Sequence, residues 1–233
     1  MNDKPIIGIV AKHYRENKKR LETFIRDEVE QAIFDNGGIA IGILPPNEDK
    51  ICPKDKWYDQ LPTEEKHNLY KQISLCQGVI LQGGGFIDEY ECFIAKYCYE
   101  YDIPILGICA GKHCLVKAVG GIRRNLEDKS HDSDKEYVHS IKIDKNSKFY
   151  SLIGKEEIMV NSRHMGYSKN VGLLKIVATS PDAVDEVVED STKTFYIGVQ
   201  FHPESLYKKD DNMRKIFTEF IRVCQENKVR KYD

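Results

Sequence analysis

The chain has 233 residues, of which 41% are hydrophobic and 31% charged, a composition typical of a globular protein with a large core. Its 35 Lys and Arg nearly cancel its 37 Asp and Glu, and the net charge of −2 excludes a strong field that would attract nucleic acid or an anionic membrane. Its apolar runs, such as residues 103–108, are too short to span a bilayer. We therefore expect neither nucleic acid nor membrane among its partners.

The cysteines and the first residues bear on the cellular compartment. Seven cysteines form an odd set with no regular spacing, and several fall in predicted helices or strands. This pattern favours reduced thiols over a disulfide framework. Residues 1–5 lack the basic and apolar regions of an export signal. Together these features predict a cytoplasmic protein.

The first half of the chain alternates short apolar runs with amphipathic stretches of helical length. In chain order, these predict a strand at 5–10, a helix at 21–36, a strand at 39–44, a helix at 63–77, a strand at 78–82, a helix at 88–101, a strand at 103–108 and a helix at 111–119. Such alternation is typical of a parallel sheet with helices on both faces.

After Gly120 and Gly121 the pattern changes to strands with few helices between them. The predicted strands are 137–143, 157–161, 174–179, 183–188 and 194–201, followed by a helix at 211–227. The sequence thus predicts an α/β fold of the doubly wound type, with a mostly parallel sheet, helices on both faces and a strand-rich, partly antiparallel second half. No repeat, low-complexity tract or linker divides the chain, so we expect residues 1–233 to form a single domain.

A candidate nucleophile lies in the sequence Gly107-Ile108-Cys109-Ala110-Gly111, between a predicted strand and a predicted helix. This G-x-C-x-G pattern is the thiol version of the strand-to-helix turn that exposes a nucleophile. The N-terminus of the following helix favours a thiolate at Cys109. In open parallel sheets, reactive groups lie beyond the carboxyl ends of the strands, where Cys109 is expected. A buried cysteine at a tight turn is the alternative, because the pattern alone is weak.

A candidate base and its partner follow the last predicted strand, in the sequence His202-Pro203-Glu204. Pro203 favours extended backbone at His202 and marks the end of the strand. Glu204 is placed to hold one imidazole nitrogen of His202 while the other faces Cys109, which fixes the tautomer and stabilises the imidazolium. The tripeptide alone also fits a surface turn, so its weight comes from its occurrence together with the cysteine turn. The economical interpretation is a Cys-His-Glu triad.

A glycine loop, Gly83-Gly84-Gly85, ends another predicted strand at the same sheet edge. Backbone N–H groups of such a loop, together with that of Ala110, are suited to hold the oxyanion of a tetrahedral intermediate. The loop lacks the Lys-Ser/Thr ending of a phosphate loop, which disfavours nucleotide binding. An ordinary strand-to-helix turn is the alternative.

These three motifs together resemble the class I glutamine amidotransferase-like family, in particular its γ-glutamyl hydrolase branch. The resemblance covers nearly the whole chain in order, from residues 4–10 to residues 198–204. It implies the fold of that family, a small γ-glutamyl substrate and no cofactor. It also implies that Cys109 is the nucleophile, His202 the base and Glu204 its partner.

The substrate-binding residues that the resemblance implies are Gly83, Gly85, His113 and His164. His113 is also a departure from the family, which usually has glutamine four residues after the nucleophile. If a charged His113 contacts the substrate carboxylate, KM should fall as the pH drops through the range in which histidine titrates. The alternative is a His113 that packs beneath the turn and contacts nothing reactive.

The predicted activity is that of a cysteine hydrolase that cleaves γ-glutamyl amide bonds, in a γ-glutamyl amine or a glutamine-like substrate, through a thioester intermediate. One alternative is a glutaminase subunit of an amidotransferase that passes ammonia to a partner synthase, since its triad would be the same. A non-catalytic binding or redox-sensing protein, with Cys109 as the sensor, is disfavoured because a sensor needs no oriented base. The leaving amine and the oligomeric state stay open, and a homo-oligomer is one option.

Metal binding is a further alternative, with Cys109, His113 and Cys114 as ligands together with another histidine. The other histidines considered are His131, His139 and His164. No C-x-x-C or H-E-x-x-H spacing accompanies these residues. A solvated or hydrogen-bonded role is the default for a single histidine, so we expect no metal site.

Overall fold

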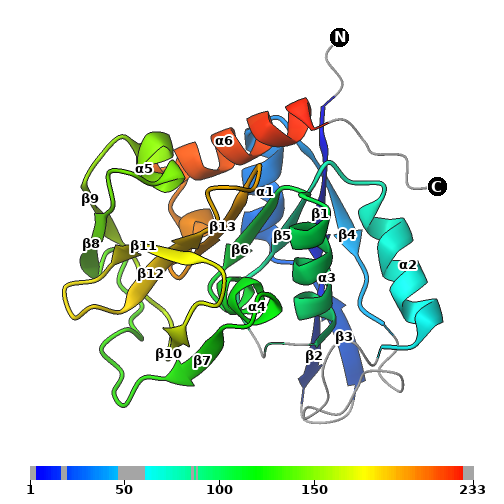
Figure 1. The fold of residues 1–233 in the computed structure, drawn as a ribbon, viewed down its shortest axis with the longest axis horizontal. Helices are drawn as coiled ribbons and strands as arrows, with labels where there is room; N and C mark the ends of the chain where they lie inside the picture. The colour runs from blue at the N-terminus through cyan, green and yellow to red at the C-terminus, as the bar shows by residue number, and fades with distance from the viewer. Residues whose placement is uncertain (1–3, 17–19, 47–60, 85–86, 88, 228–233) are drawn as a thin grey trace.

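The computed structural model describes residues 4–16, 20–46, 61–84, 87 and 89–227 of the chain. Its parallel strands are β1 (Ile6–Val10), β4 (Ile39–Ile43), β5 (Gly78–Leu81), β6 (Ile105–Ile108) and β13 (Tyr196–Val199). Its antiparallel strands are β8 (His139–Ile143), β9 (Glu157–Val160), β11 (Lys175–Thr179) and β12 (Asp185–Glu189). All nine belong to one sheet with the order β4-β1-β5-β6-β13-β12-β11-β8-β9 (Figure 1).

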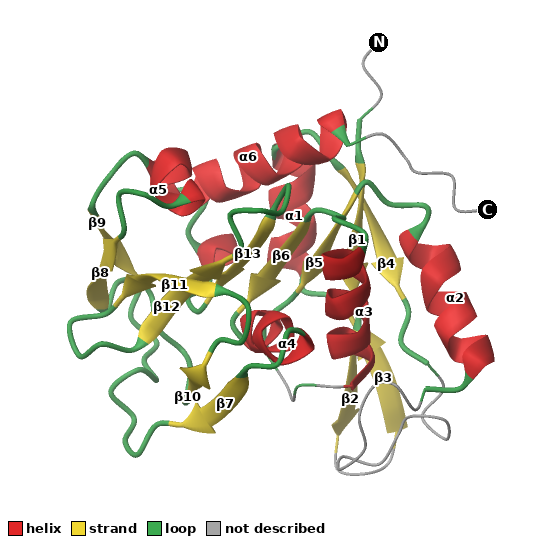
Figure 2. Cartoon of the chain, viewed as in Figure 1, coloured by secondary structure: helices red, strands yellow, loops and turns green. Residues whose placement is uncertain are grey.

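Helices cover both faces of this sheet (Figure 2). They are α1 (Asp27–Asp35), α2 (Thr63–Ile73), α3 (Glu89–Glu100), α4 (Ala110–Ala118), α5 (Lys148–Ile153) and α6 (Asp211–Glu226). The buried side chains of α1, α5 and α6 share one hydrophobic cluster, and those of α2, α3 and α4 share a second. Two apolar layers on either side of a sheet confirm the predicted α/β fold, with a parallel central part and a strand-rich second half.

The predicted helix at 21–36 is wrong in its first part. Residues 12–24 instead contain an antiparallel pair, β2 (Lys12–Glu16) and β3 (Arg20–Phe24), and the helix begins only at Asp27. The extended backbone of Arg26 (φ −74°, ψ 126°) is held by a hydrogen bond from its N–H to Oε1 of Gln82 (2.8 Å). Residues far apart in sequence make this bond, so helical spacing alone did not reveal it.

Three short elements were not predicted. They are α5 and a separate antiparallel pair formed by β7 (Ile122–Asn125) and β10 (Gly166–Asn170). The β7–β10 pair brings the segment after α4 next to residues that follow β9. Among the described helices, none is both long and apolar enough to cross a membrane.

Candidate active site

The three predicted motifs meet at one edge of the sheet because they follow three neighbouring strands. Gly83 and Gly84 follow β5, Cys109 follows β6, and His202 follows β13. Since β6 pairs in parallel with both β5 and β13, the carboxyl ends of all three strands lie together. This is the place where open α/β sheets bind their ligands.

Cys109 occupies a strained turn between β6 and α4. Its backbone has φ 50° and ψ −102°, which costs on the order of 1–3 kcal/mol for a residue other than glycine. The Cys109 N–H donates to the carbonyl oxygen of Val199 (2.8 Å). The first turn of α4 packs so closely on β5 that a Cβ on Gly111 would lie 2.1 Å from the carbonyl oxygen of Leu81. These contacts hold Cys109 at the N-terminus of α4, where the helix dipole favours a thiolate.

His202 and Glu204 form a buried pair beside Cys109. Glu204 lies in the 3₁₀ turn η3 (Pro203–Ser205), and its Oε1 is 2.7 Å from Nδ1 of His202. Because an ionised carboxylate only accepts, Nδ1 carries a hydrogen and Nε2 is left for Cys109. A Cβ on Gly83 would lie 2.6 Å from Cε1 of His202 and 3.3 Å from Cβ of Cys109, so the loop packs directly against both side chains. The three residues of the predicted triad are therefore neighbours.

The ionisation of Cys109 and His202 is coupled. Burial raises the pKa of the Cys109 thiol, but the hydrogen bond and the charge of His202 outweigh burial and lower that pKa. Burial lowers the pKa of His202, whereas the charge of Glu204 and the hydrogen bonds to Cys109 and Glu204 raise it to about 10. Both shifts favour a thiolate beside an imidazolium, which is the nucleophilic form of cysteine.

The glycine loop contributes a backbone donor to the same place. Gly84 has φ +86°, a left-handed conformation that favours glycine, and its N–H donates a hydrogen bond to Cys109 that helps to lower the thiol pKa. Ala110 is the first residue of α4, so its N–H has no partner within the helix. Arg26, which the sequence did not single out, packs against this loop, and its Nε donates to the carbonyl oxygen of Gly83 (3.2 Å). Gly85 lies outside the described residues.

His113 lies in α4, and His164 is close enough for its charge to act on His113. The His113 side chain is buried, and neither ring nitrogen has a hydrogen-bond partner among the described residues. Burial, followed by the charges of Lys112, Arg123 and His164, holds the pKa of His113 well below its usual range. Both effects favour the neutral ring, which argues against the expectation that protonation of His113 lowers KM.

Two polar anchors around the triad were not predicted. Asn161 brackets the backbone of His202, accepting its N–H at Oδ1 (2.7 Å) and donating from Nδ2 to its carbonyl oxygen (2.8 Å). Gln200 donates from Nε2 to Sγ of Cys109 (3.8 Å) and accepts at Oε1 from the buried Lys112 ammonium (2.8 Å). Lys112 also forms an ion pair with Asp185 in β12. The only sequence signal was position, since Gln200 precedes His202 by two residues and Lys112 follows Cys109 by three.

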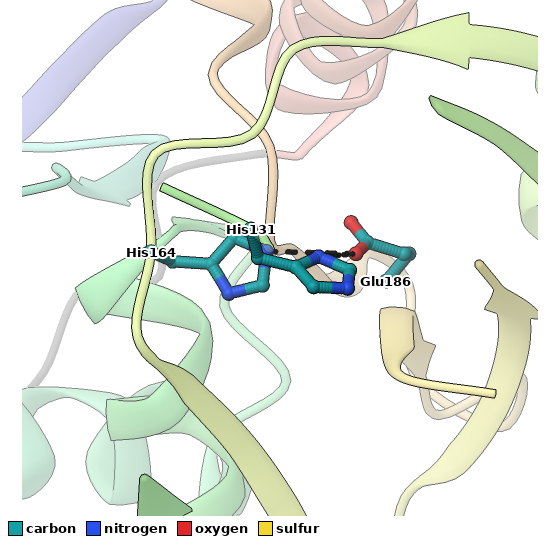
Figure 3. A group of neighbouring side chains, drawn as sticks. All are labelled: His131, His164 and Glu186. Carbon is teal, nitrogen blue, oxygen red and sulfur yellow. Dashed lines mark ion pairs between the residues drawn. The ribbon is translucent and has the colours of Figure 1, made fainter. Parts of the chain in front are cut away.

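The metal alternative built on Cys109, His113 and Cys114 is not supported by their positions. The Cys114 thiol is fully buried and hydrogen-bonds Cys92, and burial is the main reason that its pKa is raised. Among the described residues, the one group of potential metal ligands that converges is His131, His164 and Glu186 (Figure 3).

Comparisons with known proteins show the family of the chain. The sequence model of the family described as Peptidase C26 matches residues 86–204, a range that contains the three residues of the predicted triad. The chain is 27% identical to gamma-glutamyl-gamma-aminobutyrate hydrolase PuuD of Escherichia coli (strain K12), covering 97% of this chain and 96% of that protein. It is 29% identical to one of the subunits of the glutamine-hydrolyzing GMP synthase of Methanocaldococcus jannaschii, covering 82% of this chain and 96% of that protein.

Solved structures share the fold at lower identity. The glutaminase domain of Trypanosoma brucei CTPS, solved with bound acivicin, aligns with a TM-score of 0.66 at 16% identity, covering 96% of this chain and 95% of that one. A glutamine amidotransferase from Thermotoga maritima aligns with a TM-score of 0.57 at 16% identity, covering 98% of this chain and 100% of that one.

Proposed function

The chain belongs to the Peptidase C26 family, and from this premise we propose that it is a cysteine hydrolase that cleaves γ-glutamyl amide bonds through a thioester. The observation that carries the proposal is the pairing of a strained Cys109 with an imidazole whose other nitrogen is held by Glu204. A cysteine that only packs in the core needs no oriented base. The match of the whole chain with a γ-glutamyl hydrolase adds the substrate class.

Acylation uses the thiolate–imidazolium pair. The Sγ of Cys109 attacks the γ-carbonyl carbon, and the carbonyl oxygen becomes an oxyanion that accepts hydrogen bonds from the N–H groups of Gly84 and Ala110. Removing one such donor in other acyl-transfer enzymes costs about 3–4 kcal/mol of transition-state stabilisation. As the C–N bond breaks, Nε2 of His202 gives its proton to the leaving amine, and a thioester to Cys109 remains.

Deacylation reverses the roles of the same groups. The neutral imidazole of His202 accepts a proton from water, whose oxygen attacks the thioester carbonyl carbon. The C–S bond then breaks, glutamate leaves, and the thiolate–imidazolium pair is restored. Glu204 keeps Nδ1–H oriented through both steps, so Nε2 faces the reacting atoms each time.

The test is turnover of a panel of γ-glutamyl amines and free glutamine by the purified chain, with glutamate as the product measured. We expect release of glutamate from at least one member, and no release by a Cys109→Ser variant. Cys76→Ala is the matched control, because burial raises the pKa of Cys76 to about 12 and leaves it unreactive. Turnover that survives Cys109→Ser, or is lost equally in Cys76→Ala, would refute the assignment.

A glutaminase subunit is the second candidate, because one subunit of a glutamine-hydrolyzing GMP synthase matches the chain over nearly its own whole length. Its triad chemistry is the same, with ammonia as the leaving amine delivered to a synthase. Glutamine as the sole substrate, hydrolysed only when a synthase is added, favours the subunit. Turnover of γ-glutamyl amines by the chain alone favours the hydrolase. If the whole panel stays intact while Cys109 oxidises reversibly, a sensing role replaces both.

A further inference from the structure

Three histidines from separate segments converge on one buried carboxylate beside the candidate active site. His131 precedes β8, His139 is the first residue of β8, and His164 lies between β9 and β10. The ring centroid of His131 lies 4.8 Å from those of His139 and of His164. The carboxylate is that of Glu186 in β12, which is fully buried (Figure 3).

In each histidine, one ring nitrogen lies within hydrogen-bond distance of an oxygen outside the cluster. Nε2 of His131 lies 3.0 Å from Oδ2 of Asp182. Nδ1 of His139 lies 3.2 Å from the carbonyl oxygen of the next residue, and Nδ1 of His164 lies 3.0 Å from a carbonyl oxygen two residues further on. Carbonyl and carboxylate oxygens accept, so each of these nitrogens carries a hydrogen. The same arrangement fixes the tautomer of histidines that bind metals.

The other nitrogen of each ring is directed at a single oxygen of Glu186. Nδ1 of His131 and Nε2 of His164 lie 3.5 Å from Oε1, and Nε2 of His139 lies 3.6 Å from it. Neither carboxylate oxygen, nor Nε2 of His139 or His164, has a hydrogen-bond partner among the described residues. The Ser162 hydroxyl is 3.3 Å from Nδ1 of His131, but it donates its own hydrogen to the carbonyl oxygen of His131 (2.8 Å).

The cluster needs positive charge at its centre. Lone pairs of neutral imidazoles that face a carboxylate repel it, and a buried charge without a partner is costly, so either protons on the rings or a metal ion must supply that charge. Separations of 3.5–3.6 Å exceed the usual length of a charge-assisted hydrogen bond, about 2.7–2.9 Å.

The same separations match the spacing between ligands of a tetrahedral metal ion. Nitrogen and oxygen ligands about 2.0–2.2 Å from zinc lie roughly 3.3–3.6 Å from one another. The ligand atoms of His131, His164 and Glu186 all lie within 4.8 Å of one another, before any metal draws them together. We propose that His131, His164 and Glu186, with His139 as the fourth ligand, bind a divalent transition-metal ion of the zinc type.

Four protein ligands leave no open position, so the metal has a structural role rather than a catalytic one. The bound ion would link chain segments that also position His202, the candidate base. The backbone N–H of His164 donates to the carbonyl oxygen of His131 (2.8 Å), and the backbone carbonyl of Glu186 accepts from the N–H of Gln200 (2.8 Å). Asn161, three residues before His164, brackets His202. Asp182 supports the site from outside through His131.

The test measures metal binding directly and does not depend on activity. A Cys109→Ser chain, freed of metal by a chelator, is titrated with Zn²⁺ by calorimetry and with Co²⁺ by visible absorption. The serine removes the thiolate that would bind these ions at the triad. We expect one equivalent of each metal, a tetrahedral Co²⁺ spectrum without thiolate charge-transfer bands, and a Zn²⁺-dependent rise in Tm.

Three further substitutions in this background locate the site. Glu186→Gln should abolish the stoichiometric binding and the rise in Tm. Asp182→Asn should weaken Zn²⁺ binding by about 10- to 100-fold, as expected for loss of a carboxylate that orients a ligating histidine. Its side chain is 54% exposed, so this variant decides the matter if Glu186→Gln does not fold. His67→Ala, at an exposed position of α2, is the control and should bind as the parent does.

Three outcomes would overturn the proposal. They are the absence of stoichiometric binding by the parent, binding of unchanged affinity in Glu186→Gln (or in Asp182→Asn if Glu186→Gln does not fold), and loss of binding in His67→Ala. In the first case, protons rather than a metal neutralise the cluster.

Discussion

The role of Glu204 is testable through the pH dependence of a Glu204→Gln variant. Glutamine has nearly the same shape and keeps an oxygen for Nδ1–H of His202, so the variant removes the charge while leaving the geometry. The charge of Glu204 is the first of the contributions that raise the pKa of His202 from 6.5 to about 10. Because an imidazolium is the proton donor to the leaving amine, its pKa sets the basic limit of activity.

The size of the effect follows from that pKa. A rise from 6.5 to about 10 corresponds to roughly 5 kcal/mol. Glu204 and Cys109 together supply this net energy against the opposing effect of burial, so assigning half of it to the Glu204 charge gives a minimum of roughly 2 kcal/mol. We expect the basic limb of kcat/KM to move down by between one and two pH units. At a pH above that limb, the variant should be at least about 30-fold slower than the parent.

The assay is kcat/KM across the pH range on the substrate that the panel identifies, together with the pH dependence of alkylation at Cys109 by iodoacetamide. Alkylation reports the thiolate without requiring turnover. The reasoning is refuted if Glu204→Gln keeps the parent's basic limb of kcat/KM and the parent's pH profile of alkylation while its Tm is unchanged. In that case Cys109 and His202 act as a pair without the carboxylate.

Three further predictions rest on other contacts. Gly83→Ala puts a Cβ 2.6 Å from Cε1 of His202, so we expect kcat to fall by at least about 10-fold with a smaller effect on Tm; equal kcat in the variant contradicts this geometry. His113→Gln should leave the pH profile of KM unchanged, because burial and neighbouring charges favour the neutral ring of His113, and a flattened profile in the variant would contradict this direction. With the surrounding histidines protonated, as in metal-free protein, the pKa of Glu186 is lowered from 4.5 to about 2, which contributes stability that is present above pH 4.5 and is lost as the pH falls towards 2, about 3 kcal/mol in all. In metal-free protein, acid unfolding of Glu186→Gln should therefore show a weaker pH dependence between these limits, and identical curves would refute the linkage.

The parallel half of the fold and the proximity of Cys109, His202 and Glu204 were predictable because their signals are local. Each strand of the site is a short apolar run that ends in a recognisable turn, and the carboxyl ends of parallel strands meet by topology. The sequence G-x-C-x-G and the tripeptide ending in Glu204 could therefore be placed together without knowing any distance. Only the turn at Glu204 differed, since η3 rather than an extended chain brings its carboxylate back to His202.

The remaining features depend on contacts between distant residues. Helical spacing in residues 21–25 was overridden by the pairing of β2 with β3 and by the bond from Arg26 to Gln82. The histidine cluster joins three segments to β12, and no spacing within any one of them resembles a metal motif. Asn161 gave no indication that it brackets His202, because its partner lies 41 positions away.

The aliphatic part of the Lys112 side chain limits the single substitutions that the chain can accept around it. It crosses β13 at Gly198, where a Cβ would lie 2.8 Å from Cγ of Lys112, before its ammonium reaches Asp185 and Gln200. A larger residue at position 198 displaces the lysine, and losing the lysine alone leaves a buried Asp185 without its cation. An apolar core at this place would require several simultaneous changes, none favourable alone. Substitutions in the nucleophile turn should therefore be correlated in evolution with substitutions in β13, the strand before the candidate base. A variant that takes one of these two segments from a relative should fold only when it takes the other segment from the same relative.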